Sequence, residues 1–366
     1  MNVTYKEFDK NVIVNASIGS DSVDMFDVRY EPFRIYGFYD PKNPEKERFE
    51  RMPREIALTV SEGVAVQSYE PAGACVRFST DSDFVAIRVH NAWITHRPHF
   101  TDIEAGGFDL YEDTENGPIF HGVFIPPMDA KDGFESKIRL PDSRPRNFTI
   151  LFPIHACVKQ LYVGVRPGSS LGSGADYINE IPVVCYGSSI TQGTGTSRPG
   201  MVYSNILSRK LNVHIHNLGF SGQCKGEPNM ARYIAGLKMS AFIYDYDENA
   251  PTAEHLQQTH EPFFKIIRQQ HPELPIIMLT RPSIPARNAR HKPFRDVVYN
   301  TYRNAVEAGD QNVWFIDGTR YIAENGGDNC ILDGIHPNDY GYMIMAEQIQ
   351  KILEQIIAKS DDFRKG

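Results

Sequence analysis

Cysteine is scarce in this chain, and it is not arranged for cross-linking or for zinc binding. The 366 residues include five cysteines, an odd number at wide spacing and without a C-x-x-C pair. A disulfide framework needs paired cysteines and a zinc site needs closely spaced ligands, so neither is indicated. We therefore expect reduced cysteines in a cytoplasmic protein.

Long apolar segments and basic clusters are also lacking. No stretch is long and apolar enough to cross a bilayer, and residues 1–10 contain no apolar core of a secretory signal. A net charge of −8, without any Lys- or Arg-rich run, argues against nucleic acid and anionic membranes as partners. The remaining composition, 41% hydrophobic and 23% charged, is typical of a globular protein, and the length favours two domains.

Short strand-like runs fill the first half of the chain. Residues 1–28 are polar and irregular, which predicts an N-terminal arm. Between residues 29 and 168, turn-rich spacers separate runs at residues 64–69, 84–90, 119–124, 148–152 and 161–165. Many short strands of this kind are typical of an antiparallel β-sandwich or jelly roll, here with one helix expected near residues 53–62. A Gly- and Ser-rich stretch then predicts a linker at residues 169–179.

The pattern of predicted elements changes in the second half of the chain, residues 180–366. Strand-like runs at residues 181–186, 213–218, 241–246, 274–280 and 312–316 now alternate with helical patterns. The clearest helix lies at residues 342–356, where apolar residues recur with a 3.6-residue period. This alternation predicts an α/β domain with a mostly parallel sheet and helices on both faces. In such folds the functional residues gather at the carboxyl ends of the strands.

One stretch of this domain has the character of a nucleophile turn. Residues 183–193 read VVCYGSSITQG, so an apolar strand ends at Gly187 and two serines precede a second glycine. Ser189 is the favoured hydroxyl because Ser188 precedes the turn and would point sideways. At a strand-to-helix turn the N–H of Ser189 is also free to face an oxyanion. Taken alone, Gly-Ser-Ser is an ordinary loop.

Three later positions supply what a serine nucleophile needs: a base, a group that orients the base, and oxyanion donors. His336 lies three residues after Asp333, so Asp333 can accept from one ring nitrogen while the other faces the serine. Gly222 and Asn249 follow two further strands and offer a backbone N–H and a side-chain amide. Together the stretches predict a serine esterase site.

These stretches resemble the SGNH (GDSL-type) hydrolases. The motif residues of that family fall, in order, at Ser189, Gly222, Asn249, Asp333 and His336. Two departures suggest a distinct subfamily: residue 188 is Ser where the family has Asp, and residues 247–250 read Asp-Glu-Asn-Ala in place of G-x-N-D. The resemblance implies a flavodoxin-like three-layer α/β/α domain.

The first half adds to this resemblance. Residues 107–111 read GFDLY, which is similar to the G-x-D-L-Y signature of a β-sandwich module found ahead of some SGNH domains. The resemblance implies a two-domain acyl hydrolase without metal or cofactor, acting on small-molecule or oligosaccharide esters, with acetylated sugars foremost. Two alternatives stay open: an acyltransferase with the same triad and an alcohol acceptor, and an inactive carbohydrate-binding protein. A homo-oligomer is a general expectation.

Several side chains are weaker candidates. Trp93 opens a loop of aromatic and histidine residues, to residue 100, that would either wall the cleft or be solvated. Arg198 and Arg281 follow strands at the functional edge and would either hold a substrate group or pair with acids. Asp245 and Asp247 form a possible carboxylate pair for glycoside hydrolysis, which the nucleophile set makes less favoured. Two histidines at residues 96 and 99 lack a third ligand for a metal.

Overall fold

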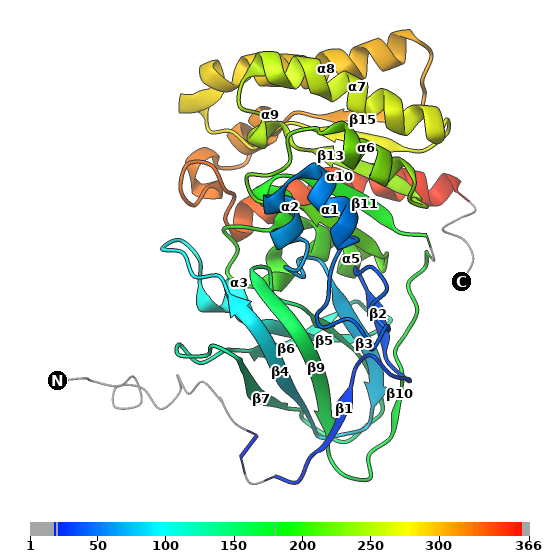
Figure 1. Cartoon of the computed structure of the whole chain (residues 1–366), viewed down its shortest axis with the longest axis vertical. Coiled ribbons are helices and arrows are strands. Elements are labelled where there is room, and N and C mark those ends of the chain that lie inside the picture. The colour runs from blue at the N-terminus through cyan, green and yellow to red at the C-terminus, as the bar shows by residue number, and fades with distance from the viewer. Residues whose placement is uncertain (1–17, 20, 180, 361–366) are drawn as a thin grey trace, which may run out of the picture.

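The computed structural model describes residues 18–19, 21–179 and 181–360 and shows two domains stacked along the long axis of the molecule (Figure 1). The N-terminal domain contains β1 (Asp24–Asp27), β2 (Arg34–Tyr36), α1 (Arg54–Val60), α2 (Glu62–Gln67), β3 (Cys75–Thr80), β4 (Phe84–Ile94), α3 (Asp102–Gly106), β5 (Phe108–Asp113), β6 (Ile119–Phe124), β7 (Gly133–Arg139), β8 (Arg146–Leu151), β9 (Ala156–Val165) and β10 (Leu171–Ser173). The C-terminal domain contains β11 (Val183–Gly187), α4 (Ser189–Gln192), α5 (Tyr203–Leu211), β12 (Ile215–Gly219), α6 (Pro228–Ala235), β13 (Ala241–Asp245), α7 (Ala253–Gln270), β14 (Ile276–Leu279), α8 (Asn288–Glu307), β15 (Val313–Ile316), α9 (Gly318–Glu324) and α10 (Asp339–Lys359). Among the described residues, no helix has the length and apolarity needed to span a membrane.

Two antiparallel sheets form the N-terminal domain. One sheet has the order β1-β9-β4-β7, and the other has the order β10-β3-β8-β5-β6 with β2 beside β3. Both sheets contribute to one apolar core, for example through Phe78 of β3 and Ile87 of β4. The predicted sandwich is therefore confirmed, while a jelly-roll connection stays a prediction. Most of the predicted arm lies outside the described residues, but β1 falls at its end, and β10 falls within the predicted linker.

The helices α1 and α2 belong to the first domain in sequence but pack on the second (Figure 1). The predicted helix near residues 53–62 is present as α1, whereas the predicted strand at residues 64–69 is wrong. Ser61 caps α2 by accepting the N–H of Val64, and Val64 and Ala65 are buried against the C-terminal core. Val66 is 50% exposed. Burial therefore follows one side of a helix, although a short apolar run of this kind suited a strand equally well.

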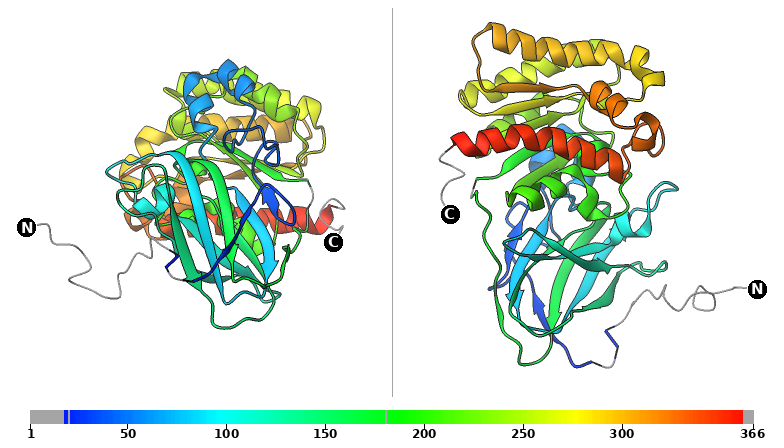
Figure 2. Two further views of the ribbon diagram at one scale, coloured as in Figure 1. Left: turned by 60° about the horizontal axis from the view of Figure 1, so that its bottom comes forward. Right: turned by 180° about the vertical axis from the view of Figure 1, so that it is seen from behind.

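The C-terminal domain is built on a five-stranded parallel sheet with the order β12-β11-β13-β14-β15. Helices α6, α7 and α8 cover one face and α5, α9 and α10 cover the other (Figure 2). Side chains of β11 alternate between the two cores, with Val184 on one side and Cys185 on the other. This confirms the predicted flavodoxin-like α/β fold. Because β11 lies between β12 and β13, the segments after these three strands meet at one edge of the sheet.

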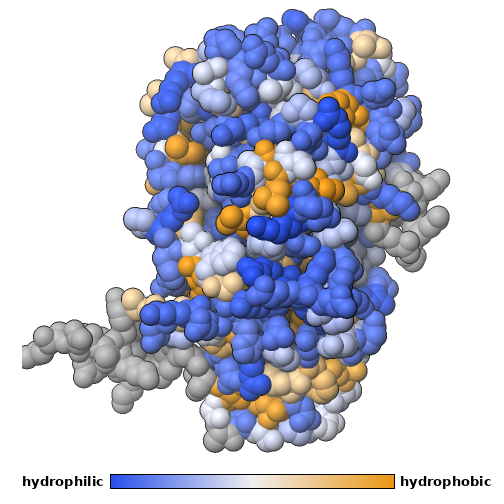
Figure 3. Space-filling view, viewed as in Figure 1, coloured by the Kyte–Doolittle hydropathy of each residue, from blue (hydrophilic) through white to orange (hydrophobic). Residues whose placement is uncertain are grey.

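The G-x-D-L-Y segment joins the two domains. Asp109 of β5 accepts a hydrogen bond from the backbone N–H of Gly200 at 2.8 Å and forms an ion pair with Arg198. The hydroxyl of Tyr111 lies 2.5 Å from the same arginine. These contacts fix the loop that follows α4, so the sandwich helps to position the sheet edge. The surface seen in Figure 3 is mainly hydrophilic, with apolar residues in small groups.

Candidate active site

Ser189 is the first residue of α4, directly beyond β11. Ser188 before it is the N-cap: its backbone is extended, its side chain is buried, and its hydroxyl accepts the N–H of Ile190 at 3.2 Å. Gly187 has no space for a side chain, because a Cβ there would lie 2.1 Å from the carbonyl oxygen of Asp245. Ser189 lines the cavity at this edge of the sheet, whereas Ser188 does not. The geometry therefore favours Ser189 as the accessible hydroxyl.

The structure brings Ser189, His336 and Asp333 into one hydrogen-bonded series. Oγ of Ser189 lies 2.8 Å from Nε2 of His336, and Nδ1 of His336 lies 2.7 Å from Oδ2 of Asp333. The other Asp333 oxygen accepts the backbone N–H groups of Ile335 at 3.0 Å and of His336 at 2.9 Å. Gly334, with φ +88°, allows this tight loop. Since a carboxylate only accepts, Nδ1 carries the proton and Nε2 can accept from the serine.

The environment keeps Asp333 ionised. Burial alone would raise its pKa, but the hydrogen bonds from the His336 backbone and ring, and from the Ile335 backbone, lower that pKa below its ordinary value. The side chains of His336 and Asp333 are 13% and 30% exposed. A carboxylate that is negative at neutral pH both fixes the imidazole tautomer and stabilises an imidazolium.

The predicted oxyanion donors lie at the same cavity as Ser189. Gly222 has φ +71°, and a Cβ placed there would meet nothing within 4 Å, so its backbone faces open space. No described residue accepts a hydrogen bond from the N–H of Ser189 or of Gly222. The side-chain amide of Asn249 donates to the carbonyl of Phe220 at 3.1 Å and keeps a second hydrogen for another acceptor.

Both domains line the cavity, whose volume is about 330 Å³. Its lining is mostly polar, with Phe100 and Ile335 as its two apolar side chains among the described residues. The N-terminal domain contributes Gln67, Glu70, Thr95, Arg97, His99, Phe100 and His155. The loop that ends at residue 100 therefore walls the cavity, as one of the two interpretations of its sequence predicted.

The three predicted substrate-binding residues do not line this cavity. Trp93 packs edge-on against Tyr69, with ring centroids 6.4 Å apart. Arg198 is occupied by the interdomain contact. Arg281 is buried, and its Nε lies 3.2 Å from a carboxylate oxygen of Asp247. Each side chain thus has a partner within the protein, and the two arginines pair with acids, which is the alternative that the sequence left open for them. A role in substrate binding stays a prediction.

The possible carboxylate pair of a glycoside hydrolase is not supported either. Asp245 is buried and accepts a hydrogen bond from Thr191 at 3.0 Å, and Asp247 is paired with Arg281. Burial, followed by the nearby charge of Asp247, raises the pKa of Asp245 well above its ordinary value. Neither carboxylate borders the cavity.

A largely buried polar network in the wall of the cavity was not found from the sequence. Nε2 of Gln192 donates to Glu70 at 2.5 Å, and Oε1 of Gln192 accepts both the N–H and the hydroxyl of Ser221 at 2.8 Å. His155 lies between two carboxylates, with Nδ1 3.7 Å from Glu70 and Nε2 3.4 Å from Glu104. Each residue type is common in loops and helices, and no local pattern reveals partners this distant in the chain.

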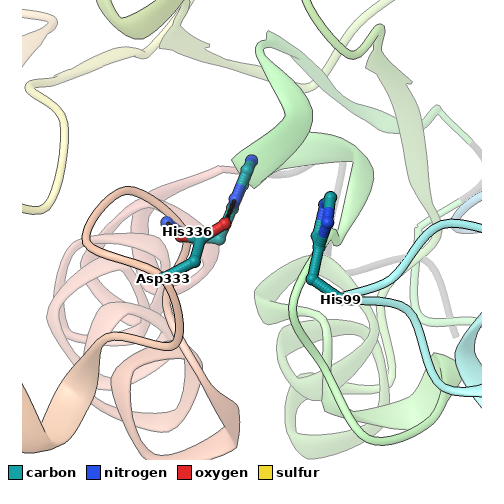
Figure 4. Close-up of side chains that lie close together, drawn as sticks. All are labelled: His99, Asp333 and His336. Atoms are coloured by element: carbon teal, nitrogen blue, oxygen red, sulfur yellow. Dashed lines mark hydrogen bonds and ion pairs between the residues drawn. The ribbon is translucent and has the colours of Figure 1, made fainter.

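Two side chains that line the cavity, with Asp333 beside them, are also close enough together to be considered for a metal ion (Figure 4). Ligand atoms of His99, Asp333 and His336 lie within 4.8 Å of one another. However, both ring nitrogens of His336 already contact Ser189 or Asp333. The His99 ring lies nearly parallel to that of His336, at 13° and a centroid distance of 5.9 Å, so in-plane lone pairs do not converge on one point. We assign no metal site here, and the expected absence of a metal stays a prediction.

Comparison with known proteins gives the family. Residues 180–354 match the sequence profile of the GDSL-like lipase/acylhydrolase family, and residues 23–171 match that of the N-terminus of SGNH-hydrolase-type esterases. The chain belongs to the SGNH/GDSL-type hydrolase family and carries both of its modules. This confirms the resemblance carried by the motif residues in both halves. No match was found among curated protein sequences.

Solved structures share the fold over both domains of this chain. A protein described as a GDSL-like lipase, from Bacteroides ovatus, has 24% identity and a TM-score of 0.81 over 92% of this chain and 98% of its own. The salicylyl-acyltransferase SsfX3 of a tetracycline biosynthetic pathway has 19% identity and a TM-score of 0.73 over 91% and 97%. An acetyl xylan esterase from the rumen bacterium Butyrivibrio proteoclasticus has 12% identity and a TM-score of 0.57 over 92% and 99%. At these identities the likeness establishes the fold alone.

Proposed function

We propose that the protein is a serine ester hydrolase that removes short acyl groups, acetyl above all, from carbohydrate or small-metabolite esters. The observation that carries this proposal is the series from Ser189 through His336 to Asp333, with contacts of 2.8 and 2.7 Å at the mouth of a cavity. A hydroxyl, an imidazole and a carboxylate in this order are the nucleophile, the base and the orienting group of serine acyl transfer.

The first half of the reaction forms an acyl-enzyme. Oγ of Ser189 attacks the ester carbonyl while Nε2 of His336 takes the hydroxyl proton, and Asp333 stabilises the resulting imidazolium. The oxyanion of the tetrahedral intermediate accepts hydrogen bonds from the N–H groups of Ser189 and Gly222 and from the Asn249 amide. The intermediate collapses as His336 returns the proton to the leaving alcohol.

The second half releases the acyl group. Water attacks the acyl carbonyl while His336 takes one of its protons, and the same donors stabilise the second oxyanion. Collapse breaks the bond to Oγ, and His336 returns the proton to Ser189. The carboxylic acid then leaves, and no metal or cofactor takes part.

The cavity supports short acyl chains and polar alcohols. It holds about 330 Å³, and most of the side chains that line it are polar, with Phe100 and Ile335 as the apolar ones among the described residues. A long alkyl chain would leave most of its surface against polar groups or water, at a cost of about 0.8 kcal/mol for each methylene left unburied. A sugar, by contrast, can exchange hydrogen bonds with the polar lining. The fold shared with an acetyl xylan esterase is consistent with this choice.

An acyltransferase is the second candidate, favoured by the fold shared with a salicylyl-acyltransferase across both domains. The same series of Ser189, His336 and Asp333 would serve, with an alcohol in place of water in the second half. In that case release of the first alcohol would accelerate many-fold only when a specific acceptor is added.

Labelling and turnover test the proposal together. We expect wild-type protein to cleave p-nitrophenyl acetate and to carry a serine-reactive phosphonate on Ser189, located by peptide mass spectrometry. The Ser189→Ala variant should lose both properties while keeping its circular dichroism spectrum. An adduct on Ser188, or full activity in Ser189→Ala, would contradict the assignment. A wild type that binds acetylated sugars without hydrolysing any ester would instead indicate an inactive binding protein.

The leaving alcohol needs a screen of its own. Acetylated oligosaccharides incubated with wild type and with Ser189→Ala would be compared by mass spectrometry, with loss of 42 Da, roughly one acetyl group, as the signal. Deacetylation by the wild type alone supports the carbohydrate esterase. Transfer of the acetyl group to an added alcohol, at the expense of free acetate, supports the acyltransferase.

A further inference from the structure

The loop that carries Gly222 is held from the N-terminal domain. Gln67, the last residue of α2, donates from Nε2 to the carbonyl oxygen of Ser221 at 2.9 Å. Arg51 of the same domain is fully buried and donates to the carbonyl of Gly219 at 2.8 Å. Two residues of the N-terminal domain therefore contact the backbone carbonyls just before Gly222.

Peptide geometry gives the Gln67 contact a chemical consequence. The carbonyl of Ser221 and the N–H of Gly222 belong to one planar trans peptide, so they point in opposite directions. A hydrogen bond that fixes this carbonyl therefore also fixes the direction of the Gly222 N–H. That N–H has no acceptor among the described residues, and the space at Gly222 is open.

The preceding peptide is fixed as well. The N–H of Ser221 can only donate, so the Gln192 atom that receives it is the amide oxygen, at 2.8 Å. The NH₂ group of Gln192 then faces Glu70, 2.5 Å away and 5% exposed. Glu70 comes from the N-terminal domain, so this second peptide is also fixed across the domain boundary, through one intervening side chain.

We propose that Gln67 is a positioning residue that aims the Gly222 N–H at the oxyanion, so that the N-terminal domain completes the oxyanion hole of the C-terminal domain. Glu70 acts on the same loop through Gln192. The inference rests on the proposed acyl-transfer function, and it assigns the sandwich a part in catalysis. If the Gly222 N–H already points at the oxyanion position, the loop does not have to rearrange as negative charge develops in the transition state. This is how a fixed donor lowers the barrier.

Two variants test the role of Gln67. Gln67→Met keeps the length of the side chain but donates no hydrogen bond, and Gln67→Glu keeps the shape but places an acceptor against the Ser221 carbonyl. Val66→Ala is the matched control, because Val66 is the neighbouring α2 residue and is 50% exposed. Turnover of p-nitrophenyl acetate would be normalised to the number of active sites, counted by the end point of phosphonate labelling.

A positioning role has a kinetic signature that a structural role lacks. We expect kcat to fall about 10- to 100-fold in both Gln67 variants, with KM within about two-fold, because the donor matters mainly in the transition state. Affinity for a boronic acid, which forms a tetrahedral adduct with the serine, should fall by the same factor. Binding of acetate, a product without that geometry, should not change, and Val66→Ala should match wild type throughout.

Two results separate the inference from the function on which it rests. A wild type that neither cleaves esters nor carries a phosphonate on Ser189 would refute the proposed function. An active wild type whose two Gln67 variants keep kcat and boronate affinity within about two-fold would overturn the inference alone. A loss confined to KM would overturn it too, since that pattern indicates a substrate contact.

Discussion

Two of the histidines that line the cavity, His336 and His155, each lie beside carboxylates, yet their surroundings differ. His336 has one carboxylate, Asp333, at Nδ1, and it has the hydroxyl of Ser189 at Nε2. His155 is 2% exposed and has a carboxylate near each nitrogen, from Glu70 at 3.7 Å and Glu104 at 3.4 Å. Phe100 covers the face of the His155 ring at 4.1 Å, with the two planes 5° apart, as an aromatic side chain can do for a cation.

The number of neighbouring carboxylates determines whether each imidazole ring can accept a proton. Burial alone would lower the pKa of His155, but the hydrogen bonds and charges of Glu104 and Glu70 outweigh it and raise that pKa above its ordinary value. A doubly protonated ring has no lone pair with which to take a proton. His336 keeps its Nε2 lone pair for Ser189. The first histidine is suited to be a fixed cation within the fold, and the second is suited to be a general base.

Removal of the base should have the largest effect. We expect His336→Ala to lower kcat/KM for p-nitrophenyl acetate by on the order of 10⁴ to 10⁶, because no other group would accept the Ser189 proton. His121→Ala is the control: this histidine lies on β6, outside the cavity, and pairs with Glu112 of β5, so its loss should leave the rate unchanged. A His336→Ala variant with more than about 1% of wild-type activity would contradict the assignment.

Asp333→Asn should have the second largest effect, a loss of up to about 10⁴-fold in kcat. The asparagine has nearly the same shape, but its amide can turn an NH₂ toward Nδ1 and so favour the tautomer with the proton on Nε2. The partial exposure of this carboxylate, 30%, lets water compensate in part, so the loss should be smaller than for His336→Ala. Steady-state kinetics beside an unchanged denaturation midpoint would check this. Equal rates for variant and wild type would mean that Asp333 does not orient the base.

Replacement of His155 should mainly lower the stability of the folded protein. His155→Leu leaves Glu70 and Glu104 without their cation, and one Glu104 oxygen already has no hydrogen-bond partner among the described residues. Breaking a buried ion pair from one side costs about 3–5 kcal/mol, so urea unfolding should show a loss of about that size. His336→Leu should cost far less stability. Combining His155→Leu with Glu104→Gln should recover part of the lost unfolding free energy. A His155→Leu protein as stable as wild type would show that His155 is not a stabilising cation and so does not differ from His336 in this way.

Much of the fold and of the site follows from local sequence patterns. The parallel sheet is predictable because strands and helices alternate along residues 180–366 with clear periodicities. Asp333 and His336 lie three residues apart, so their contact depends on one loop. Ser189, Gly222 and Asn249 meet because segments after adjacent parallel strands must emerge at one edge. None of these conclusions requires knowledge of how the two domains pack.

The missed features all depend on that packing. Gln67 contacts a residue 154 positions away and Gln192 one that is 122 positions away, so no sequence window contains both partners. Arg198 shows a related ambiguity. An arginine at the functional edge has the same appearance in sequence whether its partner is a substrate or Asp109, which lies 89 residues earlier. An arginine that pairs with a buried carboxylate of the neighbouring domain can be recognised only once both domains are placed.

The smallest expected effect concerns pH and distinguishes the two histidines without any assay of activity. The pKa of His155 is raised above 6.5 in the folded protein, so its contribution to stability is fully present below pH 6.5 and is lost as pH rises through the folded pKa. The difference in unfolding free energy between wild type and His155→Leu should therefore shrink at high pH, by about 1.4 kcal/mol for each unit by which the pKa is raised. Urea titrations between about pH 6 and 9 would measure it. A difference in unfolding free energy that stays constant or grows with pH would show that His155 is neutral in the folded protein. The number of neighbouring carboxylates would then not explain why His336 can act as a base and His155 cannot.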